Sequence, residues 1–222
     1  MDNRSSHQKS SFVNRAYAWF CAKIYNEWVG IYELIGLIIS LGAWSKWRSL
    51  VIPYIKGPRV LELGFGTGHL QEILAHRKDL EVYGLEFSIA MHQACQKRFT
   101  KKKTETFRVC ADGNQCPFLD HSFDTIFATF PERYLEKDAA IKECARLLSH
   151  SPDSQLVILG HWMESHHFIY RSLFSVFFTP PSHDEVELER VFKRQGLSLT
   201  KEAKQVGGAT VWVIIGKRDT RE

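Results

Sequence analysis

The hydrophobic and polar positions divide the chain into two parts near residue 58. Before that point an apolar stretch covers residues 29–44, interrupted by Glu33 and by glycines. It is shorter than the roughly 20 residues that a membrane span needs. Its spacing predicts an amphipathic helix with Glu33 on the polar face. The opposite, apolar face holds Ile24, Trp28, Ile31, Ile35 and Ile38. A second short helix is predicted over residues 44–54, ending before Gly57 and Pro58.

From Arg59 onward, short apolar runs alternate with segments of helical period. This alternation predicts an α/β fold in which helices cover both faces of a parallel sheet. The predicted strands cover residues 59–65, 81–87, 106–112, 123–130 and 154–162. Two further strands, residues 197–205 and 210–218, are separated by a short turn, so they must run antiparallel.

The composition indicates a folded, globular protein. The chain has 222 residues, of which 44% are hydrophobic and 24% charged. We expect residues 1–57 to form an N-terminal helical cap and residues 58–222 to form the main domain. Five scattered cysteines without a C-x-x-C pair argue against a disulfide scaffold or a zinc module. The unpaired cysteines and the lack of a secretory signal pattern at the start together favour a cytoplasmic location.

The net charge of +4 comes from the cap. Residues 1–57 hold seven basic and three acidic side chains, and the rest of the chain is balanced. A nucleic-acid partner is therefore not indicated. Four tryptophans accompany the local positive charge, at positions 19, 28, 44 and 47. This combination suggests weak peripheral contact between residues 15–48 and an anionic lipid surface.

The most informative segment is a glycine-rich loop between the first strand and the next helix. Gly64, Gly66 and Gly68 let the backbone turn sharply and approach a ligand closely. A dinucleotide fingerprint would place its third glycine at position 69, where this chain has His69. Glu62, two residues before the first glycine, suits a ligand that carries an ammonium group and repels a pyrophosphate. A tight strand–helix turn without a ligand is the alternative.

Two more acidic residues follow the next two strands. Glu86 ends the second strand, where a carboxylate can accept hydrogen bonds from both ribose hydroxyls. Asp112 and Gly113 end the third strand, where a side-chain acceptor can meet an adenine amino group. Each acid alone could be a solvated loop carboxylate. Three of them at successive strand ends, on the edge where open α/β sheets bind ligands, favour a nucleoside site.

These motifs resemble those of class I S-adenosylmethionine-dependent methyltransferases, in particular the small-molecule branch that includes quinone and phospholipid methyltransferases. The resemblance covers residues 58–217. It rests on the closing antiparallel pair and on residues 60–70, 82–91 and 110–130, and residues 37–48 look like that branch's N-terminal cap. It implies a Rossmann-like, seven-stranded sheet of order 3-2-1-4-5-7-6 with strand seven antiparallel.

The resemblance also implies a cofactor, S-adenosylmethionine, which leaves as S-adenosylhomocysteine, and a role for each site residue. Glu62 and the loop residues Gly64, Phe65, Gly66 and Gly68 would hold its methionine end. Glu86 would bind the ribose, Phe87 would lie beside the adenine, and Asp112 with Gly113 would meet the adenine amino group. Thr129 and Phe130 would border the reactive methyl group.

Methyl transfer is an in-line displacement that depends mainly on positioning, and it needs a general base only where the acceptor loses a proton. The candidate bases are His161, Glu132 and Tyr134, with His161 favoured because it lies at the end of the predicted fifth strand, on the cofactor side. A histidine hydrogen-bonded in a loop is the alternative. His161, His166 and His167 have no accompanying acidic or cysteine ligand set, so we expect no metal.

Residues 161–183 are rich in aromatic side chains and have a helical period. Together with the cap they could enclose an apolar cavity for an acceptor, although a plain buried helix has the same pattern. Enzymes that methylate base amines resemble N-P-P-Y after the fourth strand, where this chain has Thr129-Phe130-Pro131-Glu132.

The sequence therefore predicts methyl transfer to a small, partly apolar acceptor that is quinone-, lipid- or secondary-metabolite-like. A non-catalytic S-adenosylmethionine-binding module and a dinucleotide-dependent oxidoreductase are the alternatives.

Overall fold

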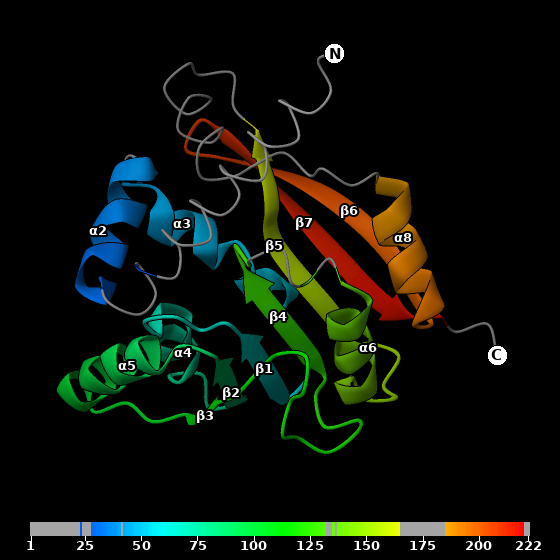
Figure 1. Cartoon of the computed structure of the whole chain (residues 1–222), viewed down its shortest axis with the longest axis horizontal. Coiled ribbons are helices and arrows are strands. Elements are labelled where there is room, and N and C mark those ends of the chain that lie inside the picture. The colour runs from blue at the N-terminus through cyan, green and yellow to red at the C-terminus, as the bar shows by residue number, and fades with distance from the viewer. Residues whose placement is uncertain are drawn as a thin grey trace, which may run out of the picture.

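The computed structural model describes residues 23, 28–40, 42–131, 135, 137–164 and 185–219. Its centre is one seven-stranded sheet of order β3-β2-β1-β4-β5-β7-β6 (Figure 1). The strands are β1 (Arg59–Leu63), β2 (Glu81–Glu86), β3 (Phe107–Cys110), β4 (Thr125–Thr129), β5 (Gln155–Glu164), β6 (Leu197–Val206) and β7 (Ala209–Arg218). The predicted strand order is confirmed.

The first five strands are parallel, and β7 runs antiparallel to both of its neighbours. The central strands β1 and β4 are buried on both faces, which explains why they appear in the sequence as continuous apolar runs. Because the parallel strands end at one edge, the loops after β1, β2, β3 and β4 all meet there. The candidate site lies along this edge.

Helices cover both faces of the sheet, as predicted (Figure 1). On one face lie α4 (His69–Leu74) and α5 (Ile89–Lys102), and on the other lie α6 (Asp138–Leu147) and α8 (Glu185–Arg194). Phe123 and Phe192 belong to the core on the α6 and α8 side, whereas Leu70 and Leu74 of α4 pack with Phe127 on the opposite side.

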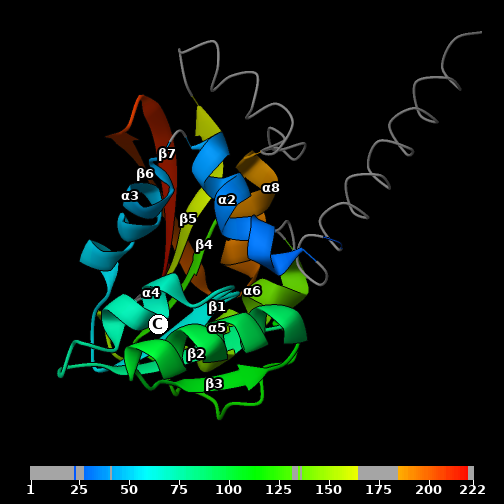
Figure 2. The same ribbon diagram turned by 90° about the vertical axis from the view of Figure 1, so that its left-hand side faces the viewer.

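The described part of the predicted cap holds α2 (Val29–Ile39), α3 (Trp44–Ser49) and a 3₁₀ turn (Ile52–Tyr54), on the same side of the molecule as α4 and α5 (Figure 2). The predicted helix over residues 44–54 is interrupted because Pro53 cannot donate a backbone hydrogen bond. Within the described ranges, no helix is long and apolar enough to cross a membrane.

The amphipathic helix α2 turns its polar side toward the protein. Glu33 is only partly exposed, whereas Leu34, Leu37 and Ile38 are 52%, 51% and 57% exposed. Gly36 lies against α3, since a Cβ there would stand 2.8 Å from Nε1 of Trp44. Leu34, Leu37 and Ile38 of α2 are thus on the surface.

Strand β5 continues to Glu164, past the predicted end at Trp162, so His161 lies inside the strand. The prediction that His161 lies at the strand end is therefore wrong. The long hairpin of β6 and β7 supplies the pairing partner, with Glu164 opposite Thr210. The helical lid predicted over residues 161–183 is wrong for residues 161–164, which are strand, and its remainder lies outside the described residues.

Candidate functional site

The glycine-rich loop leaves β1 at the carboxyl edge of the sheet with φ values of +70°, +54° and +78° at Gly64, Gly66 and Gly68. A Cβ at Gly64 or Gly66 would have no atom within 4 Å, so these positions border open space. A Cβ at Gly68 would stand 2.3 Å from Sγ of Cys95 on α5. The first two glycines therefore form an open cradle, and the third packs the loop onto a helix.

Glu86, at the end of β2, binds the backbone of this loop. Its Oε2 accepts a hydrogen bond from the Gly66 N–H at 2.9 Å, and its Oε1 accepts one from the Ser88 N–H at 2.8 Å. Burial raises the pKa of Glu86, and these backbone donors oppose the shift. Each carboxylate oxygen keeps a second lone pair, which a hydroxyl of a ligand could use.

Glu62 is buried under the loop. Its Oε2 accepts a hydrogen bond from Nε2 of Gln71 at 2.9 Å, while Oε1 of Gln71 is buried without a partner among the described residues. Burial raises the pKa of Glu62 to about 7, although the Gln71 hydrogen bond and the Arg48 charge oppose the shift. A buried carboxyl group with so little compensation is suited to receive a cationic group.

The cap reaches the loop through one carboxylate, that of Glu33 on α2. Nη1 and Nη2 of Arg48, on α3, each donate to it at 3.2 Å, and Oγ1 of Thr67 in the loop also donates to it. Burial raises the pKa of Glu33, but the Arg48 charge and these hydrogen bonds outweigh it and hold the pKa below its ordinary value. Glu33 therefore joins α2, α3 and the glycine-rich loop.

His69 makes a second contact between the cap and the domain. Burial, with the charges of Arg48 and Arg98, lowers the pKa of His69 to about 4, so the ring is neutral at pH 7. Nη1 of Arg98 lies 3.4 Å from its Nδ1 and can only donate, so Nδ1 is the acceptor. Nε2 then carries the proton and donates to Oγ of Ser45 on α3, 3.0 Å away. His69, which stands where a dinucleotide fingerprint would have its third glycine, thus links α3 to α4 through this hydrogen bond.

Phe130 follows β4 in a left-handed backbone conformation, with φ at +50°. Its ring lies 4.8 Å from the ring of Trp44, measured between centroids. A Cβ at Gly160 would stand 2.3 Å from the same ring, so the ring is held between α3 and β5. Thr129, at the end of β4, is partly buried. The Phe130 ring is therefore packed on both sides at the end of β4, where the resemblance expects the chain to border a methyl group.

Asp112 lies beyond β3 in a tight turn. Its Oδ1 accepts hydrogen bonds from the backbone N–H and the side-chain amide of Asn114, at 2.9 and 2.8 Å. The chain then passes the buried Gly113 to Cys116, whose Sγ lies 3.5 Å from the Gly113 carbonyl oxygen.

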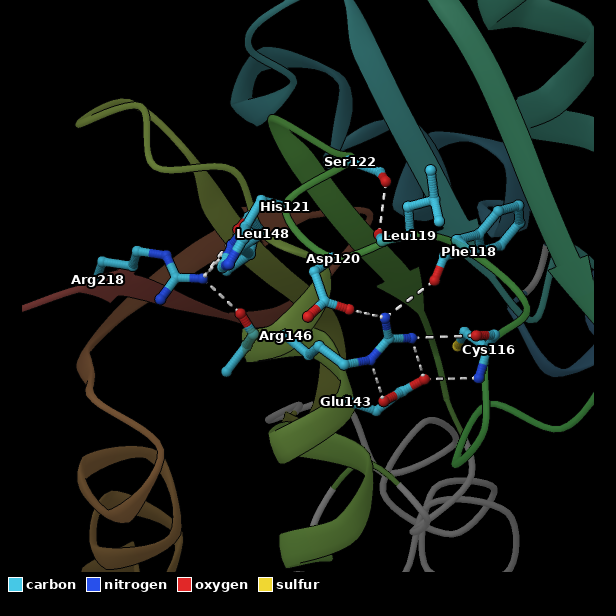
Figure 3. Close-up of polar contacts among 11 residues, drawn as sticks. Cys116, Phe118, Leu119, Asp120, His121, Ser122, Glu143, Arg146, Leu148 and Arg218 are labelled. Carbon is cyan, nitrogen blue, oxygen red and sulfur yellow. Dashed lines mark hydrogen bonds and ion pairs between the residues drawn. The ribbon is translucent and has the colours of Figure 1, made fainter.

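This loop is anchored on α6 by Glu143 and Arg146 (Figure 3). Glu143 accepts a hydrogen bond from the Cys116 N–H at 2.7 Å, and Arg146 donates to the carbonyls of Cys116 and Phe118 at 3.1 and 2.9 Å. Hydrogen bonds from Arg146 lower the pKa of Glu143, although burial opposes them. The sequence analysis did not identify Glu143 and Arg146. The available signal was an acidic and a basic residue three positions apart on a predicted helix, a spacing at which the side chains form an ion pair.

The structure brings together the loop glycines, Glu62 and Glu86. Among the other predicted residues, the Phe65 side chain is buried against α5 and only its backbone borders the loop, while Phe87 is 75% exposed. The candidate bases Glu132 and Tyr134 lie outside the described residues. The prediction missed Glu33, Arg48 and Gln71. For Glu33 the sequence did offer a signal, because a charged side chain inside an apolar stretch indicates a buried polar contact.

Comparison with known proteins extends this description. Residues 60–151 match the model of a methyltransferase domain. The chain is 34% identical over 133 residues to the demethylmenaquinone methyltransferase of Thermotoga maritima, covering 58% of this chain and 56% of that protein. It is 28% identical over 166 residues to the ubiquinone/menaquinone biosynthesis C-methyltransferase UbiE of Neisseria meningitidis serogroup C, covering 72% and 67%. The match thus spans little more than half of the Thermotoga protein.

Two solved structures show the same fold. The geranyl diphosphate C-methyltransferase of Streptomyces coelicolor, solved with Mg²⁺, geranyl diphosphate and S-adenosyl-L-homocysteine, has a TM-score of 0.61 at 12% identity over 79% of each chain. The PH0226 protein of Pyrococcus horikoshii has a TM-score of 0.60 at 16% identity, over 89% of this chain and 96% of that one.

Residues 60–151 thus match a methyltransferase domain, and the sheet has the strand order that the resemblance to class I S-adenosylmethionine-dependent methyltransferases implies. The chain is similar in sequence to proteins named as quinone methyltransferases. The residues present fit the cofactor in two respects. The cradle at Gly64 and Gly66 is open, and among the described residues no cationic side chain lies within hydrogen-bonding distance of the buried Glu62 carboxyl.

Proposed function

We propose that this chain transfers a methyl group from S-adenosylmethionine to a small, partly apolar acceptor of quinone type. The observation that carries the proposal is the bond between Glu86 and the Gly66 N–H, which joins a strand-end carboxylate to an open glycine cradle at the carboxyl edge of the sheet. Two relatives named as quinone methyltransferases support the class of acceptor.

Three carboxyl groups would bind the cofactor. In this proposal the Glu86 oxygens accept the ribose hydroxyls through their second lone pairs, and the Glu62 carboxylate receives the ammonium group. Asp112 has one oxygen engaged with Asn114, which leaves Oδ2 to accept from the adenine amino group. Charge-assisted hydrogen bonds of this kind are stronger than neutral ones, so the three acids would fix the orientation of the nucleoside.

When bound, S-adenosylmethionine supplies an electrophilic methyl group on a sulfonium centre. The contribution of the chain is alignment, which can supply roughly 7–11 kcal/mol of the barrier reduction. Phe130 is held between Trp44 and Gly160, so its ring presents a fixed apolar wall next to Thr129. A wall of this kind excludes water and favours an apolar acceptor.

A ring carbon that gains a methyl group must lose a proton, so methylation at carbon needs a proton acceptor. His161 is our proposed base, with Glu132 and Tyr134 as the other candidates. Its position inside β5, next to Gly160, places it one residue from the glycine that Phe130 contacts. Replacing His161 with Gln should lower kcat by about 10²–10⁴-fold while leaving the affinity for S-adenosylhomocysteine unchanged.

Two measurements test the proposed function. Isothermal titration should show binding of S-adenosylhomocysteine and no binding of NAD. Labelled methyl groups should then pass from S-adenosylmethionine to a short-chain demethylmenaquinone. Binding of NAD alone would favour the oxidoreductase alternative. Cofactor binding without transfer to quinone, lipid or other small acceptors would favour the non-catalytic module.

We also propose that the protein is cytoplasmic and that residues 15–48 touch membrane surfaces peripherally. The exposed Leu34, Leu37 and Ile38 of α2, beside the positive charge of the cap, support this contact. Anionic vesicles should bind the protein at low salt and release it at high salt. Leu37→Ser should weaken binding, whereas Leu119→Ser, at an exposed leucine in the loop before β4, should not. Absence of vesicle binding at low salt would refute the contact.

A further inference from the structure

Arg48 is the only cation among the buried side chains of the described residues. Its side chain is 9% exposed, and its ion-pair partner is Glu33. Removing a guanidinium from water is costly unless its donors find acceptors. A buried arginine beside a nucleoside site therefore raises the question of what its other donors bind.

Glu33 uses only one edge of the Arg48 guanidinium. The group has five N–H donors, and Glu33 accepts one from Nη1 and one from Nη2 at the end of the fork. Nε is buried and has no acceptor among the described residues. The side edge, formed by the Nε–H and the second Nη2 hydrogen, has the geometry that receives a carboxylate in a bidentate pair.

Arg48 is linked through the Glu33 carboxylate to the loop that the proposed function assigns to the methionine end of the cofactor. Glu33, which it holds, also accepts from Thr67 in that loop. Its charge acts on the pKa values of both Glu62 and His69, the residues on either side of the glycines. A methionine end carries an ammonium and a carboxylate, so the buried acid on β1 and the buried arginine on α3 match its two charges.

We infer that Arg48 binds the methionine carboxylate of the cofactor and that Glu33 is the positioning residue that aims its guanidinium. This inference rests on the proposed function. The competing explanation is an ion pair that only holds the cap in place. The two differ in one respect: a structural ion pair is indifferent to whether the ligand has a carboxylate.

The test compares two ligands that differ in that group alone. S-adenosylhomocysteine carries the carboxylate, and S-adenosyl-3-thiopropylamine lacks it but keeps the ammonium, the thioether and the nucleoside. Isothermal titration of Arg48→Met should show a loss of about ten- to a hundredfold in affinity for the first ligand and less than threefold for the second. Damage to the fold of the cap weakens both ligands equally and cancels in this comparison. The unpaired Glu33 would repel the carboxylate of the first ligand alone, so the double variant Arg48→Met with Glu33→Gln, which removes that charge, should show the same selective loss.

Glu86→Gln is the matched control, since it acts at the ribose and should weaken both ligands by the same factor. Arg48→Lys keeps the charge but loses the fork, so it should also lose affinity selectively, and it serves if Arg48→Met does not fold. Equal losses for the two ligands in the Arg48 variants would overturn the inference while leaving the proposed function standing. A wild-type protein that binds neither ligand would overturn both.

Discussion

Gly68 lies directly against Cys95: a Cβ at position 68 would stand 2.3 Å from the Cys95 sulfur, and the φ of Gly68 is +78°. The loop between β1 and α4 can sit on α5 only because residue 68 has no side chain. Gly66, two residues earlier, has the same left-handed backbone but no neighbour that a Cβ would meet. The two glycines thus serve packing and ligand approach separately.

Gly68→Ala should lower the free energy of unfolding by about 2–4 kcal/mol, because it adds both a steric clash and backbone strain. Urea denaturation measures the change. The double variant Gly68→Ala with Cys95→Ala removes the sulfur and should recover part of the loss. Its loss of unfolding free energy should therefore be smaller than the sum of the losses in the two single variants. Strict additivity would show that the two residues do not clash.

Gly66→Val should abolish binding of S-adenosylhomocysteine while leaving the fold largely intact. The valine side chain would occupy the open cradle, and the left-handed φ of +54° adds only about 1–3 kcal/mol of strain. Isothermal titration and circular dichroism measure the two effects. Undiminished affinity in a folded Gly66→Val protein would contradict our placement of the cofactor.

Glu62 should make cofactor binding depend on pH. Its pKa of about 7 in the ligand-free protein means that the carboxyl is protonated below pH 7, whereas an ammonium ligand requires the carboxylate. Affinity for S-adenosylhomocysteine should therefore rise by up to tenfold per pH unit between about pH 5 and 7 and then level off. Titrations in buffers of different ionisation enthalpy should reveal the proton released on binding.

The same shift has a consequence for the ligand-free protein. Because the folded pKa of Glu62 lies above its ordinary value of 4.5, Glu62 contributes most to stability when protonated. That contribution is lost as the pH rises from about 4.5 through about 7. Glu62→Gln should remove this part of the pH dependence of unfolding. If Glu62→Gln kept the wild-type dependence of unfolding free energy on pH, another titrating group would be responsible for it.

Arg146→Ala should destabilise the fold by about 2–3 kcal/mol, since the Glu143 carboxylate loses its cationic partner and the carbonyls of Cys116 and Phe118 each lose a donor. Thermal or urea unfolding measures the loss. Arg190→Ala on α8 is the control, because its exposed ion pair with Glu187 should contribute less than about 1 kcal/mol. Similar losses in both variants would mean that the hydrogen bonds of Arg146 contribute no more to the free energy of unfolding than an exposed ion pair does.

The sheet could be predicted because its strands are continuous apolar runs separated by helical periods and glycine turns. The loop of Gly64, Gly66 and Gly68 could be predicted because its residue types leave few backbone alternatives. These features are local in sequence. The resemblance to a methyltransferase family then supplied the strand order, which local pattern alone does not define.

Features that depend on distant partners could not be predicted. The pattern shows Glu33 as an ordinary polar residue, since nothing local reveals its bonds to Arg48 and Thr67. The extension of β5 past His161 depends on pairing with β7, about fifty residues later. Local periodicity carries no information about either contact.

The indole N–H of Trp47 donates to the carbonyl of Val206, 159 residues further along the chain. During synthesis the ribosome produces Trp47 long before the β6–β7 turn on which it docks. The nascent cap therefore leaves Trp47 without this partner until the last hairpin emerges. Competence to bind a ligand under the cap is thus among the last properties this protein acquires as it is made.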